Sequence, residues 1–178
     1  VCVVFLVWAA GLNGKPDERK TEVSARELAQ AANDVPKVKF TDITVEAGLK
    51  FTHVNGAYGD KLLPETMGGG VAFLDFDNDG DQDLLFVTGT PWPWARIAGA
   101  LPTLKLYAND GKGHFTDVTA GSGLEVIFYG TGVAIGDYDN DGLVDVLVTG
   151  VGENHLFDNL GGGKFEDVSE RSGITRAA

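Results

Sequence analysis

Short apolar and polar segments alternate along the chain from Phe40 onward, and glycine residues separate them. Segments such as GVAFL (70–74) and DLLFV (83–87) are rich in Val, Leu and Phe and are bounded by Gly or Asp. Such segments are typical of β-strands, because these side chains fit a pleated, half-buried surface. The pattern therefore predicts an all-β region.

The predicted strands fall into two groups of four. Each group reads as a strand, an acidic loop, a strand, a connection, a strand, a glycine-rich turn and a fourth strand. The strands are expected near 70–75, 83–88, 104–108 and 114–118, and near 132–137, 145–149, 154–158 and 164–168. A repeat of roughly 50–60 residues with four strands is typical of a β-propeller blade. We therefore expect antiparallel blades at about 68–124 and 130–174 within a partial propeller spanning 39–178.

One phrase occurs in three copies, which are KFTDITVEAGL from Lys39, HFTDVTAGSGL from His114 and KFEDVSERSGI from Lys164. The second and third copies supply the fourth strand of their blades. The first copy precedes the first complete blade. A closed ring takes about 4–8 blades, so we expect the missing blades to belong to the same full-length chain. We predict that Phe40–Thr44 pairs with those blades and is loosely held without them.

The residues before the blades differ in character. Residues 1–10 (VCVVFLVWAA) are apolar but too short to span a bilayer, and they fit the core of a secretory signal peptide. A buried strand is the alternative interpretation. Residues 11–38 are polar and predict a linker with a short helix in SARELAQAAND. We therefore expect a protein that is secreted or located in the cell envelope.

Acidic residues dominate the charge of the chain. The 178 residues include 26 Asp and Glu against 14 Lys and Arg, which gives a net charge of −12. A surface this negative is repelled by phosphate backbones, which argues against nucleic-acid binding. Cys2 is the only cysteine, so no disulfide can form within the chain.

Much of the acidity lies in two nonapeptides, DFDNDGDQD (75–83) and DYDNDGLVD (137–145), which are separated by a constant offset of 62. Alternating carboxylates around a glycine turn are typical of a calcium loop, because calcium takes six to eight oxygen ligands. The predicted ligands of the first loop are the carboxylates of Asp75, Asp77, Asp79 and Asp83 and the carbonyl of Asp81. Those of the second loop are the carboxylates of Asp137, Asp139, Asp141 and Asp145 and the carbonyl of Leu143. We therefore predict two Ca²⁺ ions.

The nonapeptides allow two other interpretations. An EF-hand starts in the same way but needs a Glu at its twelfth position and flanking helices. The twelfth residues here are Phe86 and Val148, inside predicted strands. The other interpretation is a solvated acidic turn without a metal ion. The occurrence of two nonapeptides with the same spacing argues against it.

Several further residues are candidates for chemistry. His53 and Glu65 can be interpreted as an acid–base pair, although no nucleophile accompanies them, and structural hydrogen bonding is the favoured role. His114 and His155 are expected in exposed positions at strand edges. Trp92 and Trp94 stand among prolines in an insertion, where they either form a binding surface or pack over a neighbouring blade.

Two longer stretches carry a family resemblance. FTHVNGAYGDKLLPETMGGGVAFLDFDNDGDQDLLFVTG (51–89) and LYANDGKGHFTDVTAGSGL (106–124) resemble FG-GAP (VCBS) repeats, the blades of integrin-α-type propellers. More closely, they resemble the cartilage acidic protein family and its bacterial relatives with an ASPIC/UnbV domain. The resemblance covers about residues 39–175. It implies a secreted or surface calcium-binding propeller that is used for binding, with metal loops at Asp75–Asp83 and Asp137–Asp145.

Two classes of function remain open at this point. The first is a calcium-stabilised module that binds an extracellular protein or glycan and has no catalytic residues. The second is the N-terminal part of a propeller enzyme, a lyase or hydrolase, with its active site on other blades. Fold alone does not separate them.

Overall fold

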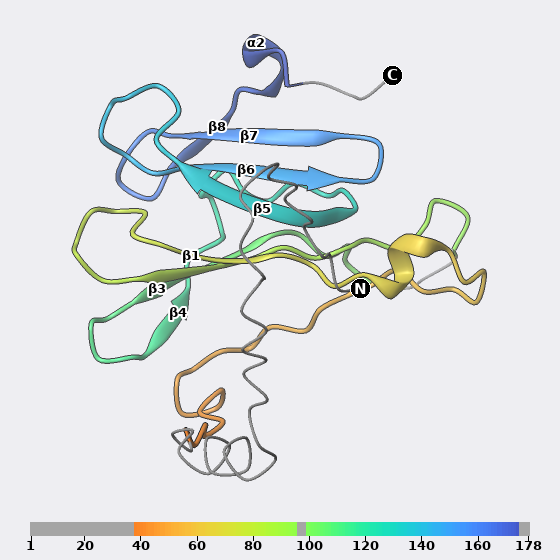
Figure 1. Cartoon of the computed structure of the whole chain (residues 1–178), viewed down its shortest axis with the longest axis horizontal. Coiled ribbons are helices and arrows are strands. Elements are labelled where there is room, and N and C mark those ends of the chain that lie inside the picture. The colour runs from red at the N-terminus through yellow and green to blue at the C-terminus, as the bar shows by residue number, and fades with distance from the viewer. Residues whose placement is uncertain (1–37, 96–98, 175–178) are drawn as a thin grey trace, which may run out of the picture. The chain divides into compact units, whose positions relative to one another are not determined.

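The computed structural model describes residues 38–95 and 99–174 (Figure 1). The predictions for residues 1–10 and for nearly all of 11–38 lie outside these described residues. The chain from Asp42 onward forms one compact unit. Within the described part of the chain, no helix has both the length and the apolar character that a membrane crossing requires.

Two four-stranded antiparallel sheets make up this unit, and each is one blade. The first blade contains β1 (Val71–Leu74), β2 (Asp83–Phe86), β3 (Lys105–Asn109) and β4 (Phe115–Asp117). The second blade contains β5 (Gly130–Gly136), β6 (Asp145–Gly150), β7 (Asn154–Asn159) and β8 (Phe165–Asp167). In both blades the strands lie in sequence order. All eight predicted strands are therefore confirmed, as is the all-β fold class.

The register places the two acidic loops at matching positions. In the first blade the last pair between β1 and β2 is Leu74 with Asp83. In the second blade the last pair between β5 and β6 is Gly136 with Asp145. Each acidic loop therefore connects the first two strands of its blade, and its ninth residue already belongs to a strand.

A shared hydrophobic core lies between the two blades, whose sheets are seen one above the other in Figure 1. Both sheets contribute to one cluster, which contains Leu74, Phe76, Leu85, Val87, Leu104, Leu106, Leu124, Phe128, Val146, Val148, Phe157 and Phe165. Burying one such side chain contributes roughly 1.5–3 kcal/mol relative to leaving it exposed. Packing against each other therefore stabilises two sheets that would each expose an apolar face alone.

The first and second copies of the repeated phrase each end in a turn that is hydrogen-bonded to the blade that follows it. The backbone N–H of Phe165 in β8 donates to the carbonyl of Ser122, at the end of the second copy (2.7 Å). The N–H of Phe115 in β4 donates in the same way to Ala47, at the end of the first copy (2.8 Å). The end of the first copy therefore docks on the first blade as the end of the second copy docks on the second blade.

The beginning of the first copy is exposed. Phe40 is 89% exposed, and the described residues 38–43 contain no strand. The pairing of Phe40–Thr44 with further blades stays a prediction, because residues 38–95 and 99–174 contain only the two blades.

Two short helices were not predicted. The 3₁₀ helix η1 (Leu63–Thr66) begins with Pro64 in its first turn, where the missing N–H of proline leaves no bond unmade. The helix α2 (Ser169–Ser172) ends at Gly173, whose φ of 75° suits a left-handed cap. Each is only one turn long, which is too short for an apolar period to reveal.

Candidate metal centre

The two acidic loops adopt the same backbone conformation. Asn78 and Asn140, at the fourth position, have φ values of 58° and 63°. Gly80 and Gly142, at the sixth position, have φ values of 93° and 90°. Glycine adopts this left-handed region without steric cost, and Asn tolerates it better than most residues. The repeated N-D-G spacing is therefore what lets each chain turn sharply around a common centre.

The first carboxylate of each loop holds the turn together. Both of its oxygens accept backbone N–H bonds from the fifth and sixth residues of the same loop. These bonds reach Asp75 from Asp79 (3.1 Å) and Gly80 (3.0 Å), and Asp137 from Asp141 (3.2 Å) and Gly142 (3.0 Å). The loops are therefore folded around this side chain by hydrogen bonds within the loop itself.

The ninth carboxylate of each loop is buried, and Asp83 and Asp145 are each only 1% exposed. Asp83 accepts the N–H of Phe76 at Oδ2 (3.1 Å) and the N–H of Asn109 at Oδ1 (2.8 Å). Burial raises the pKa of Asp83, the negative charges of Asp77 and Asp79 raise it further, and the two backbone bonds oppose this effect. A cation beside this carboxylate would stabilise its charged form.

The carboxylates converge in threes. One oxygen each from Asp75, Asp77 and Asp83 lies within 4.8 Å of the other two. The same holds for Asp137, Asp139 and Asp145. A set of carboxylate oxygens without His or Cys suits a hard cation, and a tight loop that adds backbone oxygens suits calcium in particular. The residues present therefore fit Ca²⁺.

The fifth residues, Asp79 and Asp141, do not belong to these groups of three. Each accepts the N–H of the residue two positions on, Asp81 (2.9 Å) and Leu143 (2.8 Å) respectively. Their role as ligands stays a prediction, as does the role of the two seventh-position carbonyls. The Leu143 side chain approaches Gly161 in the hairpin turn between β7 and β8. The side chain at the seventh position of the second loop therefore faces a neighbouring turn. An apolar residue such as Leu143 is accommodated there.

Asn159 is a residue of the site that the sequence interpretation missed. It ends β7 and is fully buried. Its Nδ2 donates to the carbonyl of Phe76 in the first loop (2.8 Å) and to the carbonyl of Val144 (3.1 Å). Its backbone N–H donates to Asp145 Oδ1 (2.8 Å). The signal was present in the sequence, since Asn109 stands at the same place in the first blade.

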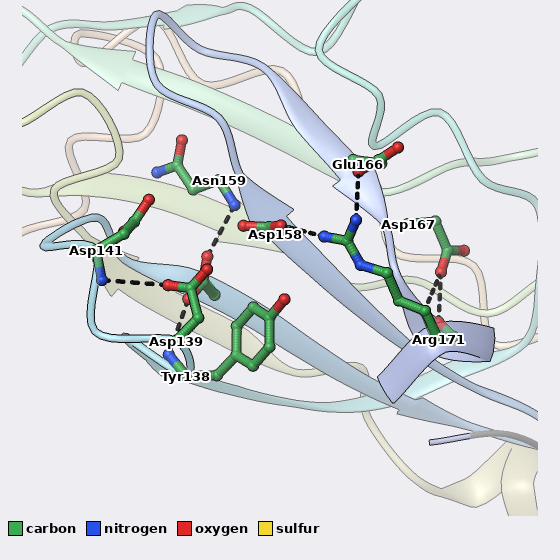
Figure 2. A network of polar contacts seen from close by, with 10 residues as sticks. Tyr138, Asp139, Asp141, Asp158, Asn159, Glu166, Asp167 and Arg171 are labelled. Atoms are coloured by element: carbon green, nitrogen blue, oxygen red, sulfur yellow. Dashed lines mark hydrogen bonds and ion pairs between the residues drawn. The ribbon is translucent and has the colours of Figure 1, made fainter. Parts of the chain in front are cut away.

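A second polar network lies beside the second loop (Figure 2). Arg171 of α2 pairs with Asp158 (2.5 Å) and with Glu166 (3.2 Å). The neighbouring Tyr138, the second residue of the loop, and the negative charges of Glu166 and Asp158 raise the pKa of Arg171. This network ties the C-terminal turn to the face of β7 and β8 and was not predicted.

The aromatic insertion resolves into two roles. The ring of Trp92 stacks on Tyr129 (4.7 Å between ring centres), which immediately precedes β5, and its indole N–H donates to Glu65 Oε1 (2.8 Å). Trp94 also stacks on Trp92 (5.3 Å between ring centres), its indole N–H donates to Asp60, and its side chain stays 56% exposed. Trp92 therefore packs against the second blade, while Trp94 presents an indole ring to solvent.

In the described part of the chain, His53 and Glu65, the candidate acid–base pair, do not bond to each other, and Glu65 has another partner. The Glu65 carboxylate is occupied by Trp92 and is largely buried. Burial and the charge of Glu65 raise the pKa of Tyr129. Among the hydrogen bonds of the described residues, none joins Glu65 to His53. Glu65 therefore has the structural hydrogen-bonding role that the sequence favoured.

The expectation for the histidines is right for one residue and wrong for the other. The side chain of His114 is 65% exposed. The side chain of His155 is only 14% exposed, because its ring packs between Phe128 and Phe157 and its Nδ1 contacts Asp167 (2.6 Å). His155 is therefore half-buried, in a strand that lies between β6 and β8, and it is not at an exposed edge of the sheet.

Comparison with protein families identifies the FG-GAP-like repeat over residues 75–148 and 137–177. The two matches begin at Asp75 and Asp137, the first residues of the two acidic loops. Together they cover residues 75–177, more than half of the chain. No curated protein matches the chain significantly.

Proposed function

The chain belongs to the FG-GAP-like repeat family, and we propose that it is a secreted or surface calcium-binding β-propeller module that binds an extracellular protein or glycan. One observation carries the proposal. The same three loop positions bring carboxylates within 4.8 Å of one another in both repeats. Within this family, we place the chain with the cartilage acidic protein relatives that carry an ASPIC/UnbV domain.

Calcium has a structural role in this proposal. The carboxylates converge only when the loop and its two strands are folded, so the free energy of calcium binding adds to the free energy of folding. Extracellular calcium modules typically bind at about 10⁻⁴–10⁻³ M, which suits a secreted location. The proposed role is binding and not catalysis, and Trp94 offers an indole ring that is 56% exposed.

Further blades are the proposed partners of the open face of the second blade. A hollow of about 500 Å³ on this face is lined by Ile135, Tyr138 and Leu147, among other residues. The equivalents of Tyr138 and Leu147 in the first blade are Phe76 and Leu85, which are 4% and 0% exposed in the core between the blades. We therefore propose that another blade of the same kind covers the second blade.

Calorimetric titration of the chelator-treated chain tests the calcium site. We expect calcium to bind at two sites and to raise the melting temperature. Magnesium should do so much less, because it is smaller and demands near-ideal octahedral geometry. If millimolar calcium produced neither heat nor a thermal shift, the proposed function would be wrong.

A further inference from the structure

A single buried residue contacts both acidic loops. The backbone N–H of Asn159 donates to Oδ1 of Asp145, the buried carboxylate of the second loop (2.8 Å). The side-chain Nδ2 of Asn159 donates to the carbonyl of Phe76, the second residue of the first loop (2.8 Å). Asn159 is 0% exposed, so water cannot replace either bond. The metal loops of two successive blades are therefore joined through one residue.

The connection continues to the buried carboxylate of the first loop. The N–H of Phe76 donates to Asp83 Oδ2 (3.1 Å), while its carbonyl accepts from Asn159. The path thus runs from Asp83 through Phe76 and Asn159 to Asp145. Both ends of this path are carboxylates of the two groups of three.

A second and weaker bridge lies at the rim of the loops. Nδ2 of Asn78, in the first loop, donates to the carbonyl of Gly142, in the second loop (3.3 Å). This bond is longer and exposed to solvent, so water competes with it. The buried bond through Asn159 is therefore the stronger of the two links.

The path can transmit order from one loop to the other. Without a cation, crowded carboxylates repel one another and favour a looser loop. If the first loop loosened and the Phe76 carbonyl moved, the buried Nδ2 group of Asn159 would lose one of its two acceptors, and a buried polar group without its partner is unfavourable. A cation that draws Asp83 toward Asp75 and Asp77 would keep Phe76 and Asn159 in place. The N–H of Asn159 would then hold Asp145 ready for the second cation.

We propose that the two calcium sites are positively coupled and that Asn159 is the positioning residue that couples them. This inference rests on the calcium binding proposed above. Coupling between two binding sites is reciprocal, so each ion must raise the affinity of the other site by the same factor.

The first blade supplies a matched control. Asn109 occupies the position of Asn159, and its N–H donates to Asp83 Oδ1 (2.8 Å). Its Nδ2 donates to Gln82 O (2.9 Å), as that of Asn159 does to Val144 O. Among the described residues, Asn109 makes no hydrogen bond to the loop of another blade. Replacing either Asn with Ala keeps the backbone N–H. Only Asn159→Ala removes a side-chain bond to the acidic loop of the other blade.

The test is calcium calorimetry on the chelator-treated 178-residue chain and its variants. Asp139→Ala leaves the first site and Asp77→Ala leaves the second, and each gives one association constant. We expect the product of the two stepwise constants of the unmodified chain to exceed the product of these single-site constants by about five-fold. The same ratio should fall to about one in the Asn159→Ala background and stay near five in the Asn109→Ala background. A purely structural role of Asn159 would lower the melting temperature without changing this ratio.

The outcomes separate this inference from the proposed function. Two calcium ions that bind with a ratio of one would overturn the coupling and leave calcium binding intact. An unchanged ratio in Asn159→Ala would overturn the role of Asn159. The absence of any calcium heat would overturn both proposals.

A second measurement covers the case in which Asn159→Ala does not fold. In the Asp139→Ala variant, calcium can enter only the first loop. We expect it to shift the side-chain amide signals of Asn159 in a heteronuclear NMR spectrum, although this residue belongs to the second blade. Unchanged signals at saturating calcium would overturn the proposed path.

Discussion

The two blades carry the same loop in different surroundings. Phe76, the second residue of the first loop, is 4% exposed because the second blade covers it. Tyr138, its equivalent in the second loop, is 42% exposed. The first blade carries Ala108 where the second carries Asp158, paired with Arg171. The backbone of a repeat is therefore set within the repeat, while the burial of its side chains is set by the neighbouring blade.

The largest test of this comparison is truncation of the two equivalent aromatic side chains. Phe76→Ala should lower the free energy of unfolding by about 3–5 kcal/mol, because it leaves a cavity between the blades. Tyr138→Ala should lower it by less than about 1 kcal/mol, since its ring is partly in solvent. Denaturant unfolding at saturating calcium measures both values. Equal losses would contradict the view that only the first loop is covered.

Removal of one calcium site from each blade should have the next largest effect. At a calcium concentration about 100-fold above the dissociation constant, one site contributes roughly 2.7 kcal/mol to stability. Asp77→Ala and Asp139→Ala should each remove one such contribution. Asp81→Ala should change stability least, because its carbonyl is the predicted ligand. Thermal unfolding with calcium and with chelator checks this, and an Asp81→Ala loss as large as that of Asp77→Ala would contradict it.

An exchange of the residues that distinguish the two blades should have a smaller effect. Ala108→Asp places a carboxylate in the hollow that Ala108 lines together with Phe76, without the arginine that accompanies Asp158, so it should lower stability by about 1–3 kcal/mol. Asp158→Ala is the reverse change, and it should have less effect because Arg171 is 57% exposed and keeps Glu166. Chemical unfolding measures the free energy of unfolding of both variants. An Ala108→Asp variant as stable as the unmodified chain would show that the packing of the blades tolerates a carboxylate at this position.

The smallest effect concerns the equivalent cross-strand pairs Lys105–Asp117 and His155–Asp167. Burial raises the pKa of both carboxyls, but hydrogen bonds outweigh it and lower each pKa, with Ser169 and His155 acting on Asp167. A lowered folded-state pKa stabilises the fold above the unfolded value of about 3.9, and this stabilisation is lost as the pH falls through the folded value.

Asp117→Asn and Asp167→Asn should therefore each destabilise the fold at pH values well above 3.9, by less than about 1 kcal/mol because both pairs are partly exposed. The difference from the unmodified chain should shrink as the pH falls below about 3.9. Urea unfolding over this pH range measures it. If the difference in the free energy of unfolding grew as the pH fell, the lowered pKa of these carboxyls would be contradicted.

Local features of the sequence predicted the strands and the two acidic loops. The alternation of apolar residues specifies which segments form strands, and the N-D-G spacing specifies the turn between them. Both signals act over a few residues, so they can be read without knowing the neighbours. For the same reason the sequence singled out the carboxylates at the first, third and ninth loop positions, which the structure brings within 4.8 Å of one another.

The tertiary structure decided what each of these residues faces. The bond from Asn159 to Phe76 spans 83 positions in the sequence, and that between Trp92 and Glu65 spans 27. The partial burial of His155 in β7 depends on Phe128, which precedes β5, an edge strand of the same blade. No local pattern encodes such pairs, because they arise only when separate strands pack. The sequence by itself therefore determined the repeated unit and its acidic loop, whereas packing of one unit on the next decided which polar groups meet across the blades.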